Sequence, residues 1–314
     1  MALPRPAARI TIDGRGLTMP EAAAVSIDVA LTLTGEHDRA ELVLGPLSPW
    51  LDIAAGARAE LELGDATTFA VLAGTVERVR HLPWGTLVDV LGPTALLEHT
   101  RVGRAYTGQT VGDIARELIS AAGAEAGDID AGPTLGAYHV DERRSCWRHL
   151  RTLAVMFAYE LSSGAGGEVH MRPPRTGRAD HTLRAGAELV SWAVGARQPG
   201  LAPAEVGPFG AASEQGAEAW SLVHHQPGGS GVHRVLPAVR DREAASAVDQ
   251  AVSAAHERTA AAGRVVSTGQ PKVRAGDLVE LDGVERAGAT YRVRRARHRI
   301  DRTGFRTTLD VEAA

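Results

Sequence analysis

The feature that most constrains this chain is an internal repeat, because a stretch near its start returns near its end. Ala55-Gly56 and Ala275-Gly276 stand at equal distances before a Glu-Leu pair, and both stretches then run through a basic segment to Arg-His and Asp-Val pairs. The offsets between the copies are 220 (275 − 55), 217 (297 − 80) and 221 (310 − 89) residues. Such nearly constant offsets indicate one supersecondary unit used twice, with other material inserted between the copies. The matching positions are Gly56, Glu60, Leu61, Arg80 and His81 in the first copy, and Gly276, Glu280, Leu281, Arg297 and His298 in the second.

A change of side-chain parity recurs at the same place in both copies. Apolar residues shift from an even to an odd position between Val76 and Val79, and shift again between Val293 and Ala296. Because side chains alternate with a period of two along a strand, one extra residue restores the apolar residues to a single face. We therefore predict a β-bulge at equivalent points of the two copies.

Length and composition indicate the number of domains and argue against several classes of protein. A chain of 314 residues with a 44% hydrophobic share is long enough for two or three domains with their own cores. The net charge of −4 argues against bulk nucleic-acid binding. Cys146 is the only cysteine, so no intrachain disulfide can form. No apolar run reaches the length of a membrane span and no secretion signal is evident, so we expect assembly in the cytoplasm.

The pattern of elements predicts an α+β, mainly β fold in three parts. Residues 1–99 predict a small tube-like β-barrel, with strands at 25–33, 40–44, 59–63, 69–80 and 86–91 separated by glycine turns. Residues 100–182 predict an α+β insert with two helices and a hairpin; Thr110 and Ser145 start the helices and Gly123 ends the first. Residues 183–314 predict a second, similar barrel with strands at 188–194 and 220–225. A helix is expected over about 242–262, ended by Gly263.

The residues offer no convincing catalytic, cofactor or metal site. His224, His225 and His233 are the best candidates for metal ligands, but neighbouring residues on a strand face opposite sides and no acidic residue or cysteine completes a tight motif. Cys146 stands at a helix start without a defined histidine partner, which is typical of a small core residue. We therefore expect a protein that is not an enzyme and carries no cofactor.

A cluster of arginines near the C-terminus allows two interpretations. One is a basic lining that faces DNA, cargo or an acidic partner inside a channel. The other is a solvated outer face whose cross-strand partners are glutamates such as Glu280 or Glu285, and this second interpretation is favoured. The core of the cluster is Arg292, Arg294, Arg295, Arg297 and Arg299, and Arg302 and Arg306 extend it.

Four stretches, taken in order, resemble the phage late control D family, the baseplate hub of contractile tails. The same module forms the N-terminal part of VgrG spike proteins. Residues 69–76 resemble the family's barrel strand that ends in Gly-x-Val, and residues 108–114 resemble its helix start. Residues 138–154 resemble the helix before its hairpin. Residues 271–279, together with 291–293, His298 and 304–308, resemble its C-terminal signature.

The resemblance implies a homotrimer with pseudo-sixfold symmetry, built from two tube-like barrels per chain. Such a hub adapts a hexameric inner tube to a trimeric spike, and the tube is initiated from it. Its implied partners are the inner tube protein, a separate spike protein, other baseplate proteins and cargo in the channel, within a virion or a phage-like injection particle. Neither a membrane span nor catalytic residues are implied.

Two other functions stay open from the sequence. A stand-alone carbohydrate- or peptide-binding β protein would need an aromatic-lined groove, and the aromatic share of 4% speaks against it. A metal-dependent hydrolase would have to use the histidines, and tight stoichiometric zinc would favour it.

Overall fold

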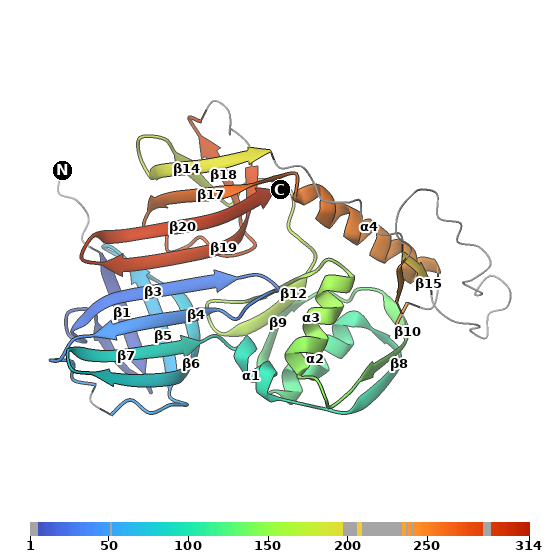
Figure 1. The fold of residues 1–314 in the computed structure, drawn as a ribbon, viewed down its shortest axis with the longest axis horizontal. Coiled ribbons are helices and arrows are strands. Elements are labelled where there is room, and N and C mark those ends of the chain that lie inside the picture. The colour runs from blue at the N-terminus through green and yellow to red at the C-terminus, as the bar shows by residue number, and fades with distance from the viewer. Residues whose placement is uncertain are drawn as a thin grey trace.

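The computed structural model describes residues 6–50, 52–196, 206–208, 234–236, 238–239, 242–284 and 290–314. Within these residues the chain is mainly β, with four helices (Figure 1). The expected α+β, mainly β class is therefore confirmed.

Strands from both ends of the chain join in one sheet. The N-terminal half of the sheet holds β1 (Ala7–Ile12), β2 (Arg15–Thr18), β3 (Ala24–Thr32), β4 (Arg39–Leu44), β5 (Arg58–Gly64), β6 (Thr68–Leu82) and β7 (Gly85–Leu91). The C-terminal half holds β13 (His181–Arg184), β14 (Leu189–Ala196), β17 (Ala261–Thr268), β18 (Leu278–Asp282), β19 (Thr290–Asp301) and β20 (Gly304–Ala313). The main path is β14-β17-β20-β19-β3-β4-β7-β6-β5-β1-β2.

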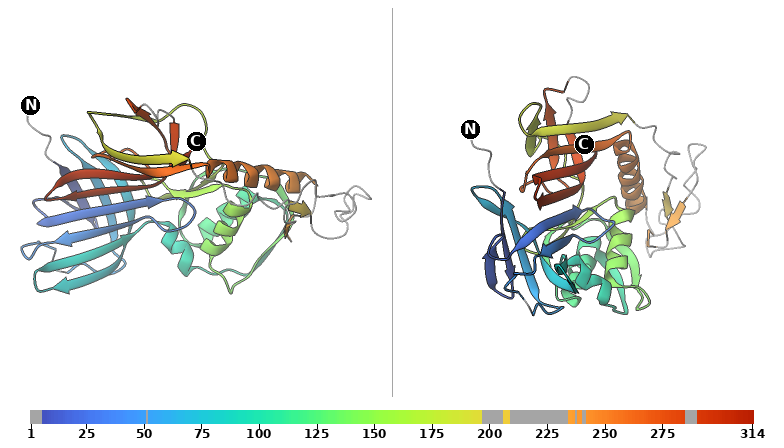
Figure 2. Two further views of the ribbon diagram at one scale, coloured as in Figure 1. Left: turned by 45° about the horizontal axis from the view of Figure 1, so that its top comes forward. Right: turned by 60° about the vertical axis from the view of Figure 1, so that its left-hand side comes forward.

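The two barrels expected from the sequence are not closed among the described residues. Instead, the pairing of β3 with β19 joins the two halves edge to edge, and Figures 1 and 2 show these blue and red strands side by side. The difference arises because an exposed strand edge is satisfied by whichever strand lies beside it, and composition does not specify that partner. One apolar core accordingly runs through both halves.

The halves share their strand order. The antiparallel run β3-β4-β7-β6 in the first half corresponds to β14-β17-β20-β19 in the second. The predicted bulge is confirmed in both copies: the β6–β7 register shifts between Val76 and Arg78, and the β19–β20 register shifts between Val293 and Arg295. A second matching pair was not predicted; it lies between Ala24 and Ser26 in β3 and between Leu189 and Ser191 in β14.

The middle of the chain forms an α+β insert. It holds α1 (Thr94–His99), β8 (Arg104–Thr110), α2 (Val111–Ala121), β9 (Glu125–Ile129), β10 (Thr134–Val140), α3 (Cys146–Met156), β11 (Glu160–Ser163) and β12 (Glu168–Arg172). Thr110 caps α2 by accepting a hydrogen bond from the Asp113 amide, and Ser145 caps α3 in the same way from Arg148. Gly123 follows α2 with a φ of 70°. The predicted helix starts and the β11–β12 hairpin are thus confirmed, whereas the β8–β10 pair was missed.

The long helix α4 (Arg242–Arg258) begins where the sequence predicts and ends earlier. Gly263 does not end it, because this glycine lies inside β17, where a Cβ atom would come within 2.3 Å of the Ala193 carbonyl oxygen of β14. The close approach of two strands, not a helix end, accounts for this glycine. α4 packs on the insert, since Ala245 and Val248 belong to the insert's core, and Figure 2 shows the helix running along it. The short strands β15 (Val206–Pro208) and β16 (Arg234–Leu236) pair in parallel, and the expected strand at 220–225 lies outside the described residues.

Candidate assembly surface

The repeated glycines occupy identical turns. Gly56 has a φ of 90° and Gly276 a φ of 93°, in the left-handed region that favours glycine. The Gly56 amide donates to the Val76 carbonyl, and the Gly276 amide donates to the Val293 carbonyl, both at 2.8 Å. The amides of Val76 and Val293 in turn donate to the residue after each glycine. Each glycine therefore anchors a strand beside the residue at which its bulge begins.

The Glu-Leu pairs lie on the strands that follow these turns. Leu61 in β5 and Leu281 in β18 are each 1% exposed and belong to the shared core, whereas Glu60 and Glu280 face solvent. In both copies, the strand alternation places the glutamate outward and the leucine inward.

The two repeat histidines each lie beside an equivalent threonine, but their environments differ. His81 lies 3.2 Å from the hydroxyl of its cross-strand neighbour Thr86, and His298 lies 3.0 Å from the hydroxyl of Thr307. His81 is exposed, whereas His298 is completely buried and its Nε2 lies 3.0 Å from the Val273 carbonyl oxygen. Burial lowers the pKa of His298 to about 4, so it is neutral at pH 7.

The strands that carry the two histidines also differ in their edge pairing. β3 pairs with β19 from Arg295 to Ile300 and satisfies that edge of the strand. The equivalent part of β6, from Arg78 to Leu82, pairs with β7 on one edge, and no described strand pairs with its other edge. One copy therefore has its outer edge satisfied inside the chain and the other has that edge open.

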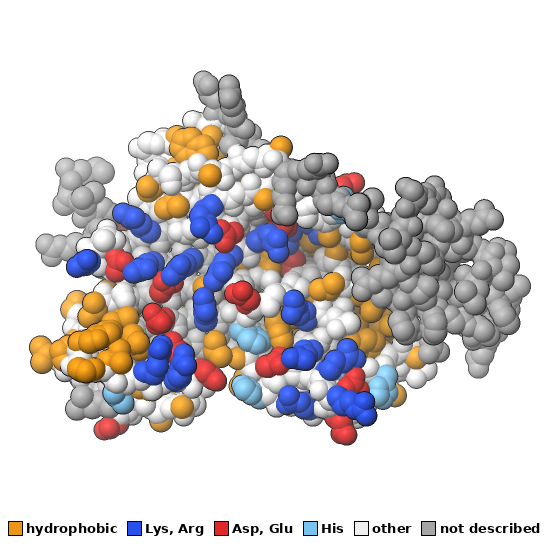
Figure 3. All heavy atoms as spheres, viewed as in Figure 1, with side chains coloured by type: hydrophobic (Ala, Val, Ile, Leu, Met, Phe, Trp, Pro, Cys, Tyr) orange, Lys and Arg blue, Asp and Glu red, His pale blue; other side chains and the backbone are white. Residues whose placement is uncertain are grey.

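Charged side chains form a ladder across the face of the sheet that Figure 3 displays. Arg78 Nε lies 2.8 Å from Asp89, Arg297 Nε lies 2.8 Å from Asp28, and Arg264 Nε lies 2.9 Å from Asp310. Blue and red side chains accordingly alternate over β20, β19, β3, β4 and β7 (Figure 3). A shallow groove on this face carries four carboxylates and three guanidinium groups, which are Asp28, Glu41, Glu77, Asp89, Arg39, Arg78 and Arg297. Such a nearly balanced face exerts little net attraction on nucleic acid.

The C-terminal arginines do not form one surface. Arg295, Arg297 and Arg299 share the charged face, while Arg292 is buried. Arg292 forms ion pairs with Glu160 of β11 and Glu312 of β20, and Arg294 reaches Glu312 at 3.4 Å from a largely exposed position. Glu280 accepts a hydrogen bond from Thr182 instead of an arginine, and Glu285 lies outside the described residues. The partners are thus mainly aspartates of neighbouring strands and the glutamates of the insert and β20.

Sequence reasoning missed a buried connection among the three parts of the chain. Arg274, which precedes β18, donates to the carbonyl oxygen of Val71 in β6 at 2.8 Å and to that of Ser163 in β11 at 3.0 Å. The Asp38 carboxylate nearby accepts from the Thr32 amide at 2.6 Å, and burial raises the pKa of Asp38 to about 6. No local pattern marks these residues, because every contact of the Arg274 guanidinium joins distant segments.

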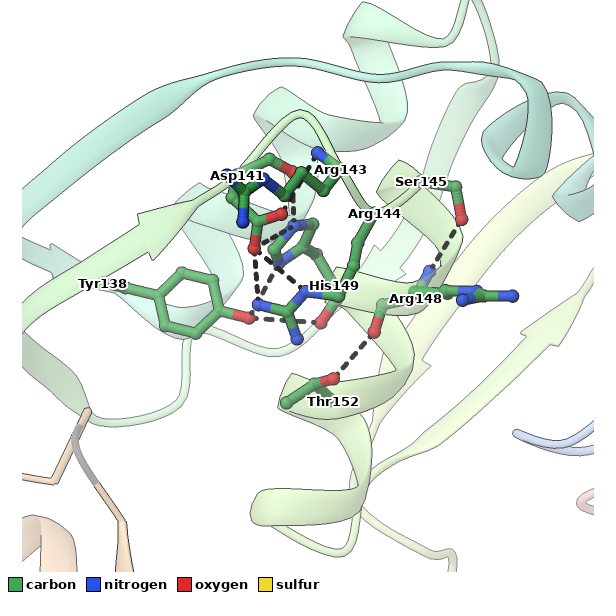
Figure 4. Close-up of polar contacts among 8 residues, drawn as sticks. All are labelled: Tyr138, Asp141, Arg143, Arg144, Ser145, Arg148, His149 and Thr152. Atoms are coloured by element: carbon green, nitrogen blue, oxygen red, sulfur yellow. Dashed lines mark hydrogen bonds and ion pairs between the residues drawn. The ribbon is translucent and has the colours of Figure 1, made fainter.

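A polar cluster in the insert fixes the turn before α3 (Figure 4). His149 is completely buried, its Nε2 lies 3.0 Å from the Asp141 carbonyl oxygen, and its Nδ1 lies 3.4 Å from the Tyr138 hydroxyl. The Asp141 carboxylate accepts two hydrogen bonds from Arg144, not from the imidazole. Burial lowers the pKa of His149, which suits a neutral imidazole that joins strand to helix.

The remaining candidates from the sequence are one cysteine and three histidines. Cys146 is buried in the core of the insert, and burial raises the pKa of its thiol, which opposes an activated thiolate. No group of three metal-ligating side chains occurs in the part of the chain that the structure describes, and His224, His225 and His233 lie outside it. No described helix is both long and apolar enough to cross a membrane.

Comparison with known proteins finds no matching family model and no matching curated protein. Solved structures do share the fold. A tail protein from Neisseria meningitidis superposes with a TM-score of 0.73 at 16% identity, over 98% of this chain and 96% of that one. The 43 kDa tail protein of a Shewanella oneidensis prophage gives 0.69 at 14% identity, over 97% of both chains. A type VI secretion system component from E. coli, described as similar to T4 bacteriophage tail proteins, gives 0.64 at 12% identity over 97% of this chain and 76% of its own.

Proposed function

We propose that this chain is a non-enzymatic hub protein of a contractile tail or phage-like injection particle. Three copies form a ring with six near-equivalent positions, which adapts a hexameric inner tube to a trimeric spike. The observation that carries the proposal is the internal repeat, because one chain presents the same four-stranded run twice, with matching bulges and matching glycine turns. The fold shared with tail and type VI secretion proteins over almost the whole chain supports it.

The physical logic is one of symmetry. A repeated unit inside a chain lets a threefold ring offer six similar surfaces to a sixfold partner, and a threefold partner can still distinguish the two copies. The division of the chain at residues 99 and 182 belongs to this proposal, with the insert and α4 lying outside the ring of strands. The charged ladder suits a channel wall that cargo passes without adhering, because most of its arginines are already paired.

The proposed partners are the inner tube protein, a spike protein and other baseplate proteins, within a virion or an injection particle assembled in the cytoplasm. The test is native mass spectrometry of the chain, alone and co-expressed with spike and tube proteins from its own gene cluster. A species of about 99 kDa, three times the 33.0 kDa chain, is expected. Particles from a strain lacking the gene should also be missing their tubes. Normal particles without the protein would contradict the proposal.

A further inference from the structure

The repeat identifies two strand edges that have no partner among the described residues as the two sides of one junction. β3 and β14 are equivalent strands, and so are β19 and β6. Inside the chain, β3 of the first copy pairs with β19 of the second. The remaining edges are therefore that of β14, beyond its bridge at Leu189, and that of β6 after Thr75.

We propose that β14 of one chain pairs antiparallel with β6 of a second copy of this chain, in the register of the internal β3–β19 junction. The matching bulges fix the correspondence on both strands. The internal pairs Arg297–Ala30, His298–Val29 and Ile300–Ile27 then become Arg80–Gly195, His81–Val194 and Pro83–Trp192 between chains. The number of copies that this junction links rests on the proposed function, whereas the register rests on the repeat alone.

Exposed apolar side chains support a second copy as the occupant. Ile27 and Val29 are completely buried at the internal junction, whereas Trp192, the equivalent of Ile27, is 45% exposed. Val190 beside it is 55% exposed, and Trp84, at the tip of the β6–β7 hairpin, is 56% exposed. The proposed register places Trp192 of one chain opposite Pro83 of the next and adjacent to Trp84. An unpaired edge strand that carries a large exposed tryptophan favours aggregation of a monomer, and pairing with a second copy removes this risk.

The side-chain position at Gly195 is open. A Cβ atom added there points off the face of β14 and would meet no atom within 4 Å, so a larger side chain has room at this position. The polar anchor of the internal junction, Arg297 with Asp28, has no counterpart, because Ala193 takes the place of the aspartate. Apolar contact therefore replaces an ion pair, and the junction between chains should depend less on salt than exposed charge pairs do.

The test is disulfide trapping in the full chain with the double variant Arg80→Cys and Gly195→Cys. Directly opposite residues on paired strands lie within the Cα separation that a disulfide needs. The out-of-register control is Arg80→Cys with Ser191→Cys, displaced by four residues or roughly 13 Å. The geometric control is Arg297→Cys with Ala30→Cys, which should close within one chain. The parent chain, in which the buried Cys146 is the only cysteine, controls for links formed through that residue.

Mild oxidation should link the first variant into covalent dimers and closed trimers that revert on reduction, at least about tenfold faster than the out-of-register control. Trp192→Glu should reduce association at least about tenfold, whereas Val155→Glu, at an exposed apolar residue of α3, should not. A trimer by mass that forms no in-register link would overturn the junction and leave the ring standing. A chain that neither links nor associates, with or without its partners, would overturn both.

Discussion

At the scale of single residues, His298 ties the stability of the second copy to pH. Its folded pKa of about 4 lies below the ordinary value of 6.5, so between these values the unfolded chain binds a proton that the folded chain refuses. The stabilisation is complete above pH 6.5 and declines as the pH falls toward 4. We expect His298→Gln to flatten this part of the stability profile, as measured by urea unfolding at a series of pH values. His81→Gln, at the exposed equivalent, is the matched control. An unchanged slope in His298→Gln would contradict the assignment.

Asp38 changes the stability of the folded chain with pH in the direction opposite to His298, over nearly the same pH range. Its folded pKa of about 6 lies above the ordinary 3.8, so the folded chain retains a proton that the unfolded chain has lost. Its contribution to stability is present below pH 3.8 and is lost as the pH rises through 6. Asp38→Asn should therefore gain stability relative to the parent chain as the pH increases from about 4 to 6, in the same unfolding series. A constant difference between the two proteins would show that Asp38 is not protonated in the folded state.

Local residue signals predicted well where the chemistry is local. Thr110, Ser145 and Gly123 marked helix ends because capping depends on neighbours three residues away. Asp38 and Arg274 were invisible for the opposite reason, since their partners come from segments far apart in the chain. Each of the matching histidines has an equivalent threonine partner, but only the tertiary fold could show that His298 is buried and His81 is exposed.

At the scale of elements, the repeated turns should be equally sensitive to substitution. Gly276→Ala and Gly56→Ala each force a side chain into the left-handed region and should destabilise the protein by about 1–3 kcal/mol. Gly195→Ala, in open space with an ordinary φ, is the control and should leave stability nearly unchanged. Thermal unfolding of the three variants measures the effect. Tolerance of alanine at only one of the two turns would mean that the copies do not share a template.

Elements were predictable where their periodicity was unambiguous. The strands of the first half follow from alternation and glycine turns, and the bulges follow from parity. The predicted helix extends too far, because the alanine-rich composition of α4 continues over residues 259–263, where the chain already enters β17. Pairing of β17 with β14 and β20 decides that segment, and such non-local pairing overrides local propensity.

At the scale of the whole molecule, Arg274 links the two halves and the insert. Arg274→Met should cost about 3–5 kcal/mol, because it leaves the Val71 and Ser163 carbonyls and the Asp38 carboxyl without their buried partner. Arg78→Ala, which breaks an exposed pair with Asp89, should cost at most about 1 kcal/mol. Denaturant unfolding compares the two variants. Equal effects would contradict a linking role for Arg274.

The joining of the halves was the main feature of the whole molecule that sequence reasoning did not reach. The repeat predicts two similar units and is silent on whether they close separately or share a sheet. The pairing of β3 with β19 decides this, and it leaves the equivalent edges of β14 and β6 without a described partner.

Electron cryomicroscopy of assembled particles that contain this protein distinguishes these arrangements directly. The proposed function and the proposed junction predict three chains around one axis, with six near-equivalent four-stranded segments and an uninterrupted sheet that crosses from β14 of each chain to β6 of the next. A ring with one chain at each of six positions would contradict it, as would three chains whose β6 and β14 edges face solvent.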